Sequence, residues 1–238
     1  MNELTGYVIR AHGGLERWNA HTHVRAHLRN GGALWAWKGQ EGVLDEIDVR
    51  VELHRQFASH FPFGDPELRT AFTQDHVAIL NGAGPVAQRD DPRAAFAGHA
   101  ETTPWDRLHL AYFCGYAMWT YLTAPFSFAL PGVRCEDLGD WAERGETWRR
   151  LRVTFPDEIA THCSQQTFYY GEDGLLRRHD YTAEVVGGGP AAHYASAYGE
   201  FDGIMVPTKR RAYPIGEDGT VLHQPLLVSI DLSAIHFE

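Results

Sequence analysis

From about residue 133 to residue 235, apolar and polar side chains alternate along a succession of short segments. A period of two is typical of β-strands, because successive side chains of a strand point to opposite faces of the sheet. Glycine and aspartate turns such as 171–174 and 202–203 separate the segments, since these residues tolerate positive φ values. The expected strands lie near 133–142, 147–155, 159–170, 175–186, 192–201, 204–213 and 225–235. Short loops between consecutive strands predict an antiparallel meander.

The N-terminal part of the chain begins with an amphipathic segment at residues 3–18, which is typical of a helix. Gly13 and Gly14 lie inside this segment, where each glycine costs about 1 kcal/mol relative to alanine. The pair therefore predicts close packing or a break in the helix. Further strands are expected at 21–29, 33–39, 47–54, 69–73 and 76–80.

The middle of the chain departs from the strand pattern. Residues 82–103 are rich in Gly, Ala, Pro and Asp, and we expect a long connection of the kind that often covers a site. Thr103 and Pro104 then predict the start of a helix, with Thr103 as its N-cap. This helix runs to about Leu122 and is apolar on nearly every side, which indicates a buried helix. We therefore expect residues 82–130 to form a loop-plus-helix insertion that covers a cavity.

Composition limits the class of protein. The chain has 238 residues, 44% of them apolar, and we expect one domain over residues 1–238. Its 31 acidic and 21 basic residues give a formal charge of −10, which disfavours nucleic acid as a partner. Neither a secretory signal nor a run of about 18 apolar residues is present, so we expect a cytoplasmic protein without a membrane span. The pattern leaves the oligomeric state open.

Two segments resemble hairpins of the LolA-like superfamily of outer-membrane lipoprotein sorting proteins. They are residues 169–178, with a Tyr, a turn, Gly-Leu-Leu and Arg, and residues 198–209, with Tyr, Asp-Gly-Ile and Pro-Thr. The opening segment with Gly-Gly-Leu-Glu-Arg at 13–17, followed by a strand, is also similar to members of this group. The resemblance implies an α+β fold in which a strongly curved antiparallel sheet, an unclosed β-barrel, has helices filling its concave side. It further implies an apolar ligand on that side and transfers no catalytic residues.

The strand expected at 175–186 carries the side chains best suited to chemistry. Alternation places Arg177, His179 and Tyr181 on the face toward the concavity. There His179 would act as a general acid or base, Tyr181 as a hydrogen-bond donor and Arg177 as an anion clamp. The alternative is a polar network inside the core, because burying such groups without partners costs a few kcal/mol each.

The apolar middle helix offers a second candidate surface, a stripe of aromatic side chains. The stripe consists of Trp105, His109, Tyr112, Tyr116 and Trp119. If it faces the open half of the sheet, it forms an aromatic wall for an apolar ligand, with His109 as a second acid or base opposite His179. The alternative is that these aromatic residues belong to the core. Arg210 lies on a strand whose alternation allows it to point inward and to hold an acidic group.

Evidence for metals and cofactors in the sequence is weak. His21 and His23 lie on one face of a strand and could share a metal ion, but Val24 and Leu28 look like the inward residues, which turns the histidines to solvent. Fourteen histidines in all keep metal binding open without locating a site. Phosphate-binding, nucleotide-binding and zinc-protease motifs are absent, so we expect no organic cofactor and assign no metal ligand.

Three functions remain in competition. The first is a protein that binds a hydrophobic or aromatic small molecule in the cavity of the curved sheet. The second is a lyase, isomerase or hydrolase that needs no organic cofactor and uses His, Tyr and Arg for acid-base chemistry on such a ligand. The third is a metal-dependent enzyme with histidine ligands.

Overall fold

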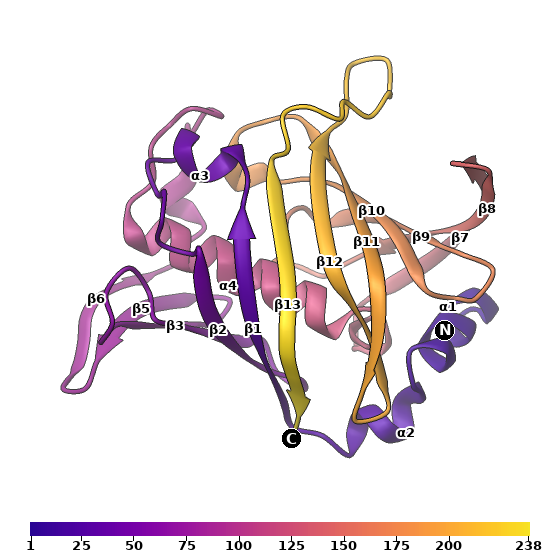
Figure 1. Cartoon of the computed structure of the whole chain (residues 1–238), viewed down its shortest axis with the longest axis horizontal. Helices are drawn as coiled ribbons and strands as arrows, with labels where there is room; N and C mark the ends of the chain where they lie inside the picture. The colour runs from indigo at the N-terminus through magenta and orange to yellow at the C-terminus, as the bar shows by residue number, and fades with distance from the viewer.

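The computed structural model describes all 238 residues and contains one antiparallel sheet of 13 strands (Figure 1). Consecutive strands pair with each other except the sixth and the seventh, and the first and last strands also pair and so join the two halves of the chain. The strands are β1 (His23–Gly31), β2 (Glu46–Glu52), β3 (Phe57–Phe61), β4 (Arg69–Phe72), β5 (His76–Asn81), β6 (Gly84–Asp90), β7 (Arg134–Glu143), β8 (Glu146–Thr154), β9 (Gln165–Tyr170), β10 (Leu176–Thr182), β11 (Pro190–Phe201), β12 (Ile204–Pro214) and β13 (Val228–Phe237).

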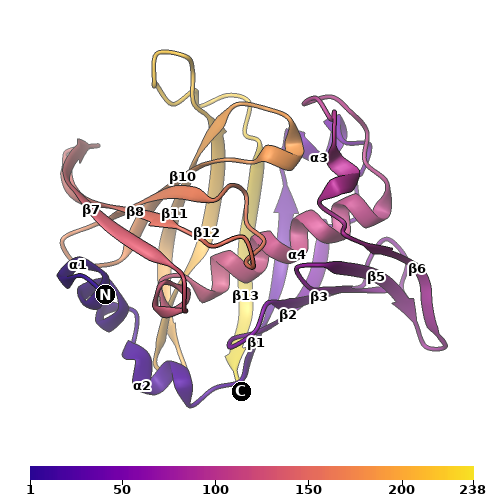
Figure 2. The same ribbon diagram turned by 180° about the vertical axis from the view of Figure 1, so that it is seen from behind.

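The sheet is curved and remains open, because its edge strands β6 and β7 do not pair with each other. Four α-helices and three short 3₁₀ helices accompany it. They are α1 (Glu3–Ala11), α2 (Gly14–Asn19), α3 (Ala33–Trp37), α4 (Arg107–Thr123), η1 (Ala94–Phe96), η2 (Phe126–Ala129) and η3 (Glu184–Val186). Figure 2 shows α4 lying across the concave side of the sheet. The expected α+β architecture, a curved antiparallel sheet around a helix, is confirmed.

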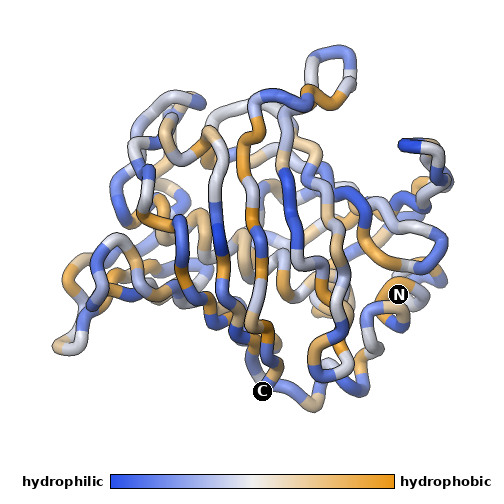
Figure 3. Tube along the Cα trace, in the orientation of Figure 1, coloured by the Kyte–Doolittle hydropathy of each residue, from blue (hydrophilic) through white to orange (hydrophobic).

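The core lies between α4 and the concave face. Every residue of α4 from Leu110 to Thr123 is buried, as the all-apolar pattern predicts. Inward side chains of the strands meet the helix, and the hydropathy along the central strands alternates accordingly (Figure 3). A second, smaller core joins α1 to η2 and to strands β8–β10. None of the helices combines the length and the apolar character that a membrane span requires.

Some expected elements differ from the structure. Residues 33–37 form α3 instead of a strand, because Gly32 at φ 111° ends β1 and lets Leu34 and Trp35 turn into the core. The connection expected at 82–103 contains β6, which forms a hairpin with β5, and β3 was not expected at all. Helix α4 begins at Arg107, with Asp106 rather than Thr103 as its N-cap.

The break expected at the opening glycine pair is present between α1 and α2. Gly13 has φ 123°, and a Cβ atom at this position would lie 2.4 Å from the carbonyl oxygen of Gly203. Both predicted explanations for the glycine pair, a break in the helix and close packing, therefore apply at Gly13.

The Gly13→Ala variant should lose about 2 kcal/mol of unfolding free energy, because the β-carbon strains the backbone and collides with the hairpin between β11 and β12. Gly14→Ala is the matched control, since Gly14 also has a positive φ of 83° but no atom within 4 Å of the added carbon. Urea denaturation of both variants measures the difference. Equal losses of unfolding free energy in the two variants would show that the close approach to Gly203 adds nothing to the cost of the Gly13 substitution.

Candidate ligand cavity

Two adjacent apolar pockets lie between α4 and the concave side of the sheet, and we treat them as two chambers of one candidate cavity. The outer chamber has a volume of about 240 Å³ and opens beside α3, while the inner chamber holds about 30 Å³ beneath α4. Phe113, Tyr181 and Val228 line both chambers, and we call the boundary at these three side chains the neck. The inner chamber is further lined by Leu28, Asn30, Trp35, Leu44, Ile47, His60, Cys114, Ala117, Met118, Tyr121 and Ile230.

The helix contributes one face to this cavity. Phe113, Ala117 and Tyr121 are spaced by four residues, so they form one line along α4. Ala117 is the smallest of the three, and its short side chain contributes to the space beneath the helix. Most of the remaining lining residues of both chambers are apolar as well. The arrangement suits an apolar guest.

The rim of the outer chamber is formed by α3, Glu101 and the glycines at 188–189. Lys38, at the end of α3, is fully buried and donates to the carbonyl oxygens of Val186 at 2.8 Å and Ala100 at 3.1 Å. Burial lowers the pKa of Lys38 to about 8. This lysine ties α3 to the two segments that border the opening.

A chain of hydrogen bonds runs behind the neck. The Tyr116 hydroxyl lies 3.2 Å from His162 Nδ1, and His162 Nε2 lies 2.7 Å from the Tyr121 hydroxyl. The Tyr121 hydroxyl is 3.0 Å from that of Tyr181, which is 3.4 Å from His193 Nδ1. All of these side chains are buried, so the chain stiffens the wall of the cavity.

Burial keeps these groups uncharged. It lowers the pKa of His162 to about 3 and the pKa of His193 well below its usual value. It also raises the pKa of Tyr121 to about 12. In each case the low-polarity surroundings disfavour the ionised form.

The structure brings together two of the four side chains that the sequence suggested for catalysis. The rings of His179 and Tyr181 lie 4.7 Å apart. Tyr181 borders the cavity, but His179 does not: its Nε2 contacts Gln166 Oε1 at 2.6 Å, and its ring stacks on Phe168 at 4.0 Å. Burial lowers the pKa of His179 well below its usual value.

Arg177 lies apart from these residues. The pairing of β10 with β9 shifts between Leu176 and Arg178, and this bulge interrupts the alternation on which the expected inward direction of Arg177 rests. Arg177 instead contacts Asp173 at 2.8 Å and Glu146 at 3.4 Å, near the hairpin turn. The neighbouring Arg178 is buried and pairs with Asp180 at 2.6 Å.

His109 lies at the other end of α4 and has a structural partner on each ring nitrogen. Its Nδ1 accepts from the backbone N–H of Asp106, while the Asp106 carboxylate accepts from the backbone N–H of His109. This reciprocal pair closes the N-terminus of α4. Nε2 of His109 contacts the carbonyl oxygen of Ala95 at 3.2 Å. The catalytic roles of all four side chains stay predictions.

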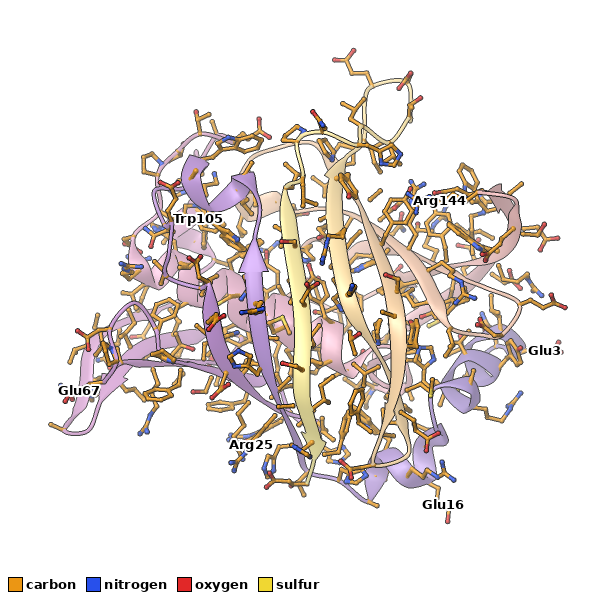
Figure 4. The ribbon with its side chains drawn as sticks, viewed as in Figure 1. Glu3, Glu16, Arg25, Glu67, Trp105 and Arg144 are labelled. Atoms are coloured by element: carbon orange, nitrogen blue, oxygen red, sulfur yellow. The ribbon has the colours of Figure 1, made fainter.

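The aromatic stripe packs mainly against the β3–β5 side of the sheet. Tyr112 contacts Phe72 at 5.5 Å between ring centroids, and Trp119 donates to two backbone carbonyls in the turn after β2. Trp105 lies near α3, as Figure 4 shows, and its ring is 5.1 Å from Lys38 Nζ. Trp105, Tyr112, Tyr116 and Trp119 line neither chamber. We interpret the stripe as core, with Tyr112 also bordering a polar hollow beside the turn after β4.

Arg210 points inward, as its alternation allows, and is 2% exposed. It does not pair with a carboxylate; its Nη2 donates to the carbonyl oxygen of Tyr121 at 2.7 Å, and its guanidinium lies 4.9 Å from the ring of that residue. In a continuing helix that carbonyl would accept from the residue four positions later, but this residue is Pro125, which has no N–H. Arg210 therefore completes the C-terminus of α4.

The exposed histidines of β1 have acidic neighbours. His23 contacts Glu238 at 3.0 Å, and His27 contacts Asp48 at 2.9 Å. Val24 and Leu28 are buried on the opposite face, as expected. No group of three or more His, Cys, Asp or Glu side chains is arranged to hold a metal ion.

A larger hollow of about 560 Å³ lies elsewhere, between the turn after β4 and the loop before β9. It is polar, and most of its charged side chains are acidic: Asp75, Asp91, Asp157 and Glu184. Its arginine, Arg93, is already paired with Glu184 and with the carbonyl oxygen of Thr161. We therefore place the candidate ligand site in the apolar cavity.

Comparison with known proteins gives matches in structure alone. No protein-family model matches the sequence, and no curated protein matches it. A DUF1329 family protein from Desulfovibrio piger superposes with a TM-score of 0.56 at 11% identity, over 99% of this chain and 92% of the other. A LolA superfamily protein from Nitrosomonas europaea gives a TM-score of 0.51 at 10% identity, over 94% and 91% of the two chains. The chain has the LolA-like half-barrel fold.

A third similar structure of this half-barrel fold is an outer membrane lipoprotein-sorting protein domain from Vibrio parahaemolyticus. Its TM-score is 0.55 at 10% identity, and the match covers 99% of this chain and 91% of that one. The resemblance that the two hairpins carry is thus confirmed at the level of the fold. At these identities the likeness concerns the architecture alone.

Apart from Tyr181, sequence reasoning missed the residues that line the cavity. Phe113, Ala117 and Tyr121 lie on the face of α4 beside the aromatic stripe, and Val228 lies at the start of β13. The available signal was a small residue, Ala117, between two aromatic residues at a spacing of four. Small side chains leave space between a helix and a sheet, whereas large aromatic residues fill it.

Proposed function

We propose that this half-barrel binds a hydrophobic small molecule in the cavity between α4 and the concave face of the sheet. One observation carries the proposal: an apolar outer chamber of about 240 Å³ adjoins the smaller inner chamber at Phe113, Tyr181 and Val228. Pockets for drug-sized ligands typically measure about 300–1,000 Å³, so the guest is a small one. The family resemblance in the two hairpins also implies an apolar ligand.

Binding is favoured over catalysis by the placement of the acid-base candidates. A general acid or base must come within hydrogen-bond reach of its substrate, yet His179 and His109 line neither chamber. Of the four acid-base candidates, only Tyr181 borders the chambers, and its hydroxyl contacts Tyr121 and His193. The cytoplasmic location stays a prediction.

Replacing Val228 by tryptophan tests the proposal, because the larger side chain at the neck fills the outer chamber. Binding of the neutral fluorescent probe N-phenyl-1-naphthylamine should weaken at least about tenfold, the affinity ratio of a 1.4 kcal/mol loss. Val86→Trp is the matched control, since Val86 lies on β6 and is 54% exposed.

Organic extraction of the freshly purified protein, followed by mass spectrometry, should in addition release an apolar compound. Tight probe binding that Val228→Trp leaves unchanged would contradict the assignment of the cavity. Failure of the unaltered protein to bind the probe would contradict the proposed function.

A further inference from the structure

The inner chamber contains one polar group without a partner. His60 on β3 is completely buried and lines this chamber, and no hydrogen-bond partner lies within reach of its Nε2 atom. An unpaired buried polar group costs about 1–3 kcal/mol. The rest of the chamber wall is mostly apolar, so Nε2 of His60 is a distinctive feature of the site.

The other ring nitrogen of His60 fixes the protonation of the ring. The Thr70 hydroxyl oxygen accepts from the backbone N–H of His60 at 2.9 Å and lies 3.3 Å from Nδ1. Its own proton is therefore available to Nδ1, and the thiol of Cys114 lies 3.5 Å from the same nitrogen. We assign the Thr70 hydroxyl as the donor to Nδ1, because this arrangement gives the hydroxyl proton a partner. We assign the ring proton to Nε2, which makes that nitrogen a free hydrogen-bond donor.

The direction of the ring places this donor at the chamber. His60 lines the inner chamber, and its Nδ1 is already in contact with Thr70 on β4 and with Cys114 on α4, so Nε2 is the ring nitrogen that is left without a protein partner. The two nitrogens of an imidazole ring point in different directions, so Nε2 faces away from β4. Burial also lowers the pKa of His60 to about 3, which keeps the ring neutral.

The charge around the cavity excludes an anionic head group. Neither chamber is lined by Lys or Arg, and the one charged residue at the outer chamber is Glu101. A carboxylate or phosphate inside would have no cation to pair with, and burying an unpaired charge is far more costly than burying a neutral polar group. A neutral acceptor suffers no such penalty.

We propose that the natural ligand is an uncharged apolar compound with one hydrogen-bond-accepting oxygen, a carbonyl or hydroxyl group, that reaches Nε2 of His60. This inference rests on the proposed function and specifies its ligand class. The apolar body occupies the outer chamber, and the oxygen passes the neck formed by Phe113, Tyr181 and Val228. An inner chamber of about 30 Å³ holds a group of the size of one water molecule, which suits a single oxygen function.

Three naphthalene probes of similar shape test the ligand class: 2-acetylnaphthalene, 2-ethylnaphthalene and 2-naphthoate. The ketone should bind the unaltered protein about 2- to 10-fold more tightly than the hydrocarbon, which is the value of one net hydrogen bond. The carboxylate should bind at least about tenfold more weakly than the ketone. Fluorescence titration measures all three, and infrared spectroscopy should show a lowered carbonyl stretching frequency for the bound ketone.

The variant His60→Leu should lose the preference for the ketone and the shift in its carbonyl frequency while still binding the hydrocarbon. His54→Leu is the control, because His54 is exposed and its contacts, with the backbone of His21 and the ring of Trp18, lie outside both chambers. If neither ketone nor hydrocarbon binds, the proposed function itself fails. If both bind equally to the unaltered protein, or if the carboxylate binds best, the cavity function stands and the ligand class is wrong.

Discussion

Lowering the pH from 8 to 5.5 should remove roughly 7 kcal/mol from the free energy of unfolding. Five histidines are buried and neutral in the folded protein: His12, His60, His162, His179 and His193. Burial lowers the pKa of His12 to about 4 and that of His60 and His162 to about 3, and it lowers the pKa of His179 and His193 well below the usual value. Such a loss is comparable with the whole stability of a typical domain, about 5–15 kcal/mol.

The sign follows from the protons that each state binds. Unfolded histidine takes up a proton near pH 6.5, whereas burial lowers the pKa of His12 to about 4 and of His60 and His162 to about 3, and it lowers the pKa of His179 and His193 in the same direction. Between these values the unfolded state binds more protons, so stability falls as the pH falls, by about 1.4 kcal/mol per histidine at pH 5.5. Burial raises the pKa of Asp180, and this single carboxyl group acts in the opposite direction.

Urea denaturation at pH 8 and at pH 5.5 measures this loss. The variant His60→Leu should lose about one fifth less stability than the unaltered protein between the two pH values, because one of the five titrating groups is gone. Leu110→Ala, a cavity-forming change on α4, is the control and should lower stability equally at both pH values. A difference between pH 8 and pH 5.5 of less than about 2 kcal/mol for the unaltered protein would refute the account.

The sheet was largely predictable because its information is local. Alternation and turn residues located most of the strands, and Gly171 to Gly174 and Asp202-Gly203 marked hairpins that the structure contains. The errors occurred where a local pattern competes with tertiary contacts. Ala33–Trp37 is apolar enough for a strand, yet Gly32 and the contacts of Ala33 and Leu34 with the loop before β13 hold it as a helix.

The candidate site was less predictable, because a cavity is the space that side chains leave unfilled. Alternation placed His179 and Tyr181 on the inner face, but a one-residue bulge displaced Arg177, and a bulge has no reliable local signal. The alternation along its strand allowed Arg210 to point inward, but it did not predict which group Arg210 contacts. That partner is a carbonyl group left free by Pro125, which becomes evident only when the end of α4 lies beside β12.

Because Trp119 belongs to the core and does not line the cavity, we expect its substitution to change stability rather than ligand binding. Its ring is 1% exposed, lines neither chamber, and its Nε1 donates to the carbonyl oxygens of Glu52 and Arg55, both at 3.0 Å. Trp119→Ala should therefore cost about 3–5 kcal/mol of unfolding free energy through the cavity that it creates. Thermal or urea denaturation measures this loss.

Trp119→Phe separates a core role from a ligand-binding role. It retains most of the ring and removes the N–H donor, so it should cost about 1–3 kcal/mol through the two unpaired carbonyl groups. Its affinity for N-phenyl-1-naphthylamine should equal that of the unaltered protein, because the ring lies outside the cavity. A variant with normal stability and lost probe binding would instead identify the stripe as the ligand wall. The outcome thus decides whether the guest lies between α4 and β13 or on the opposite side of the helix.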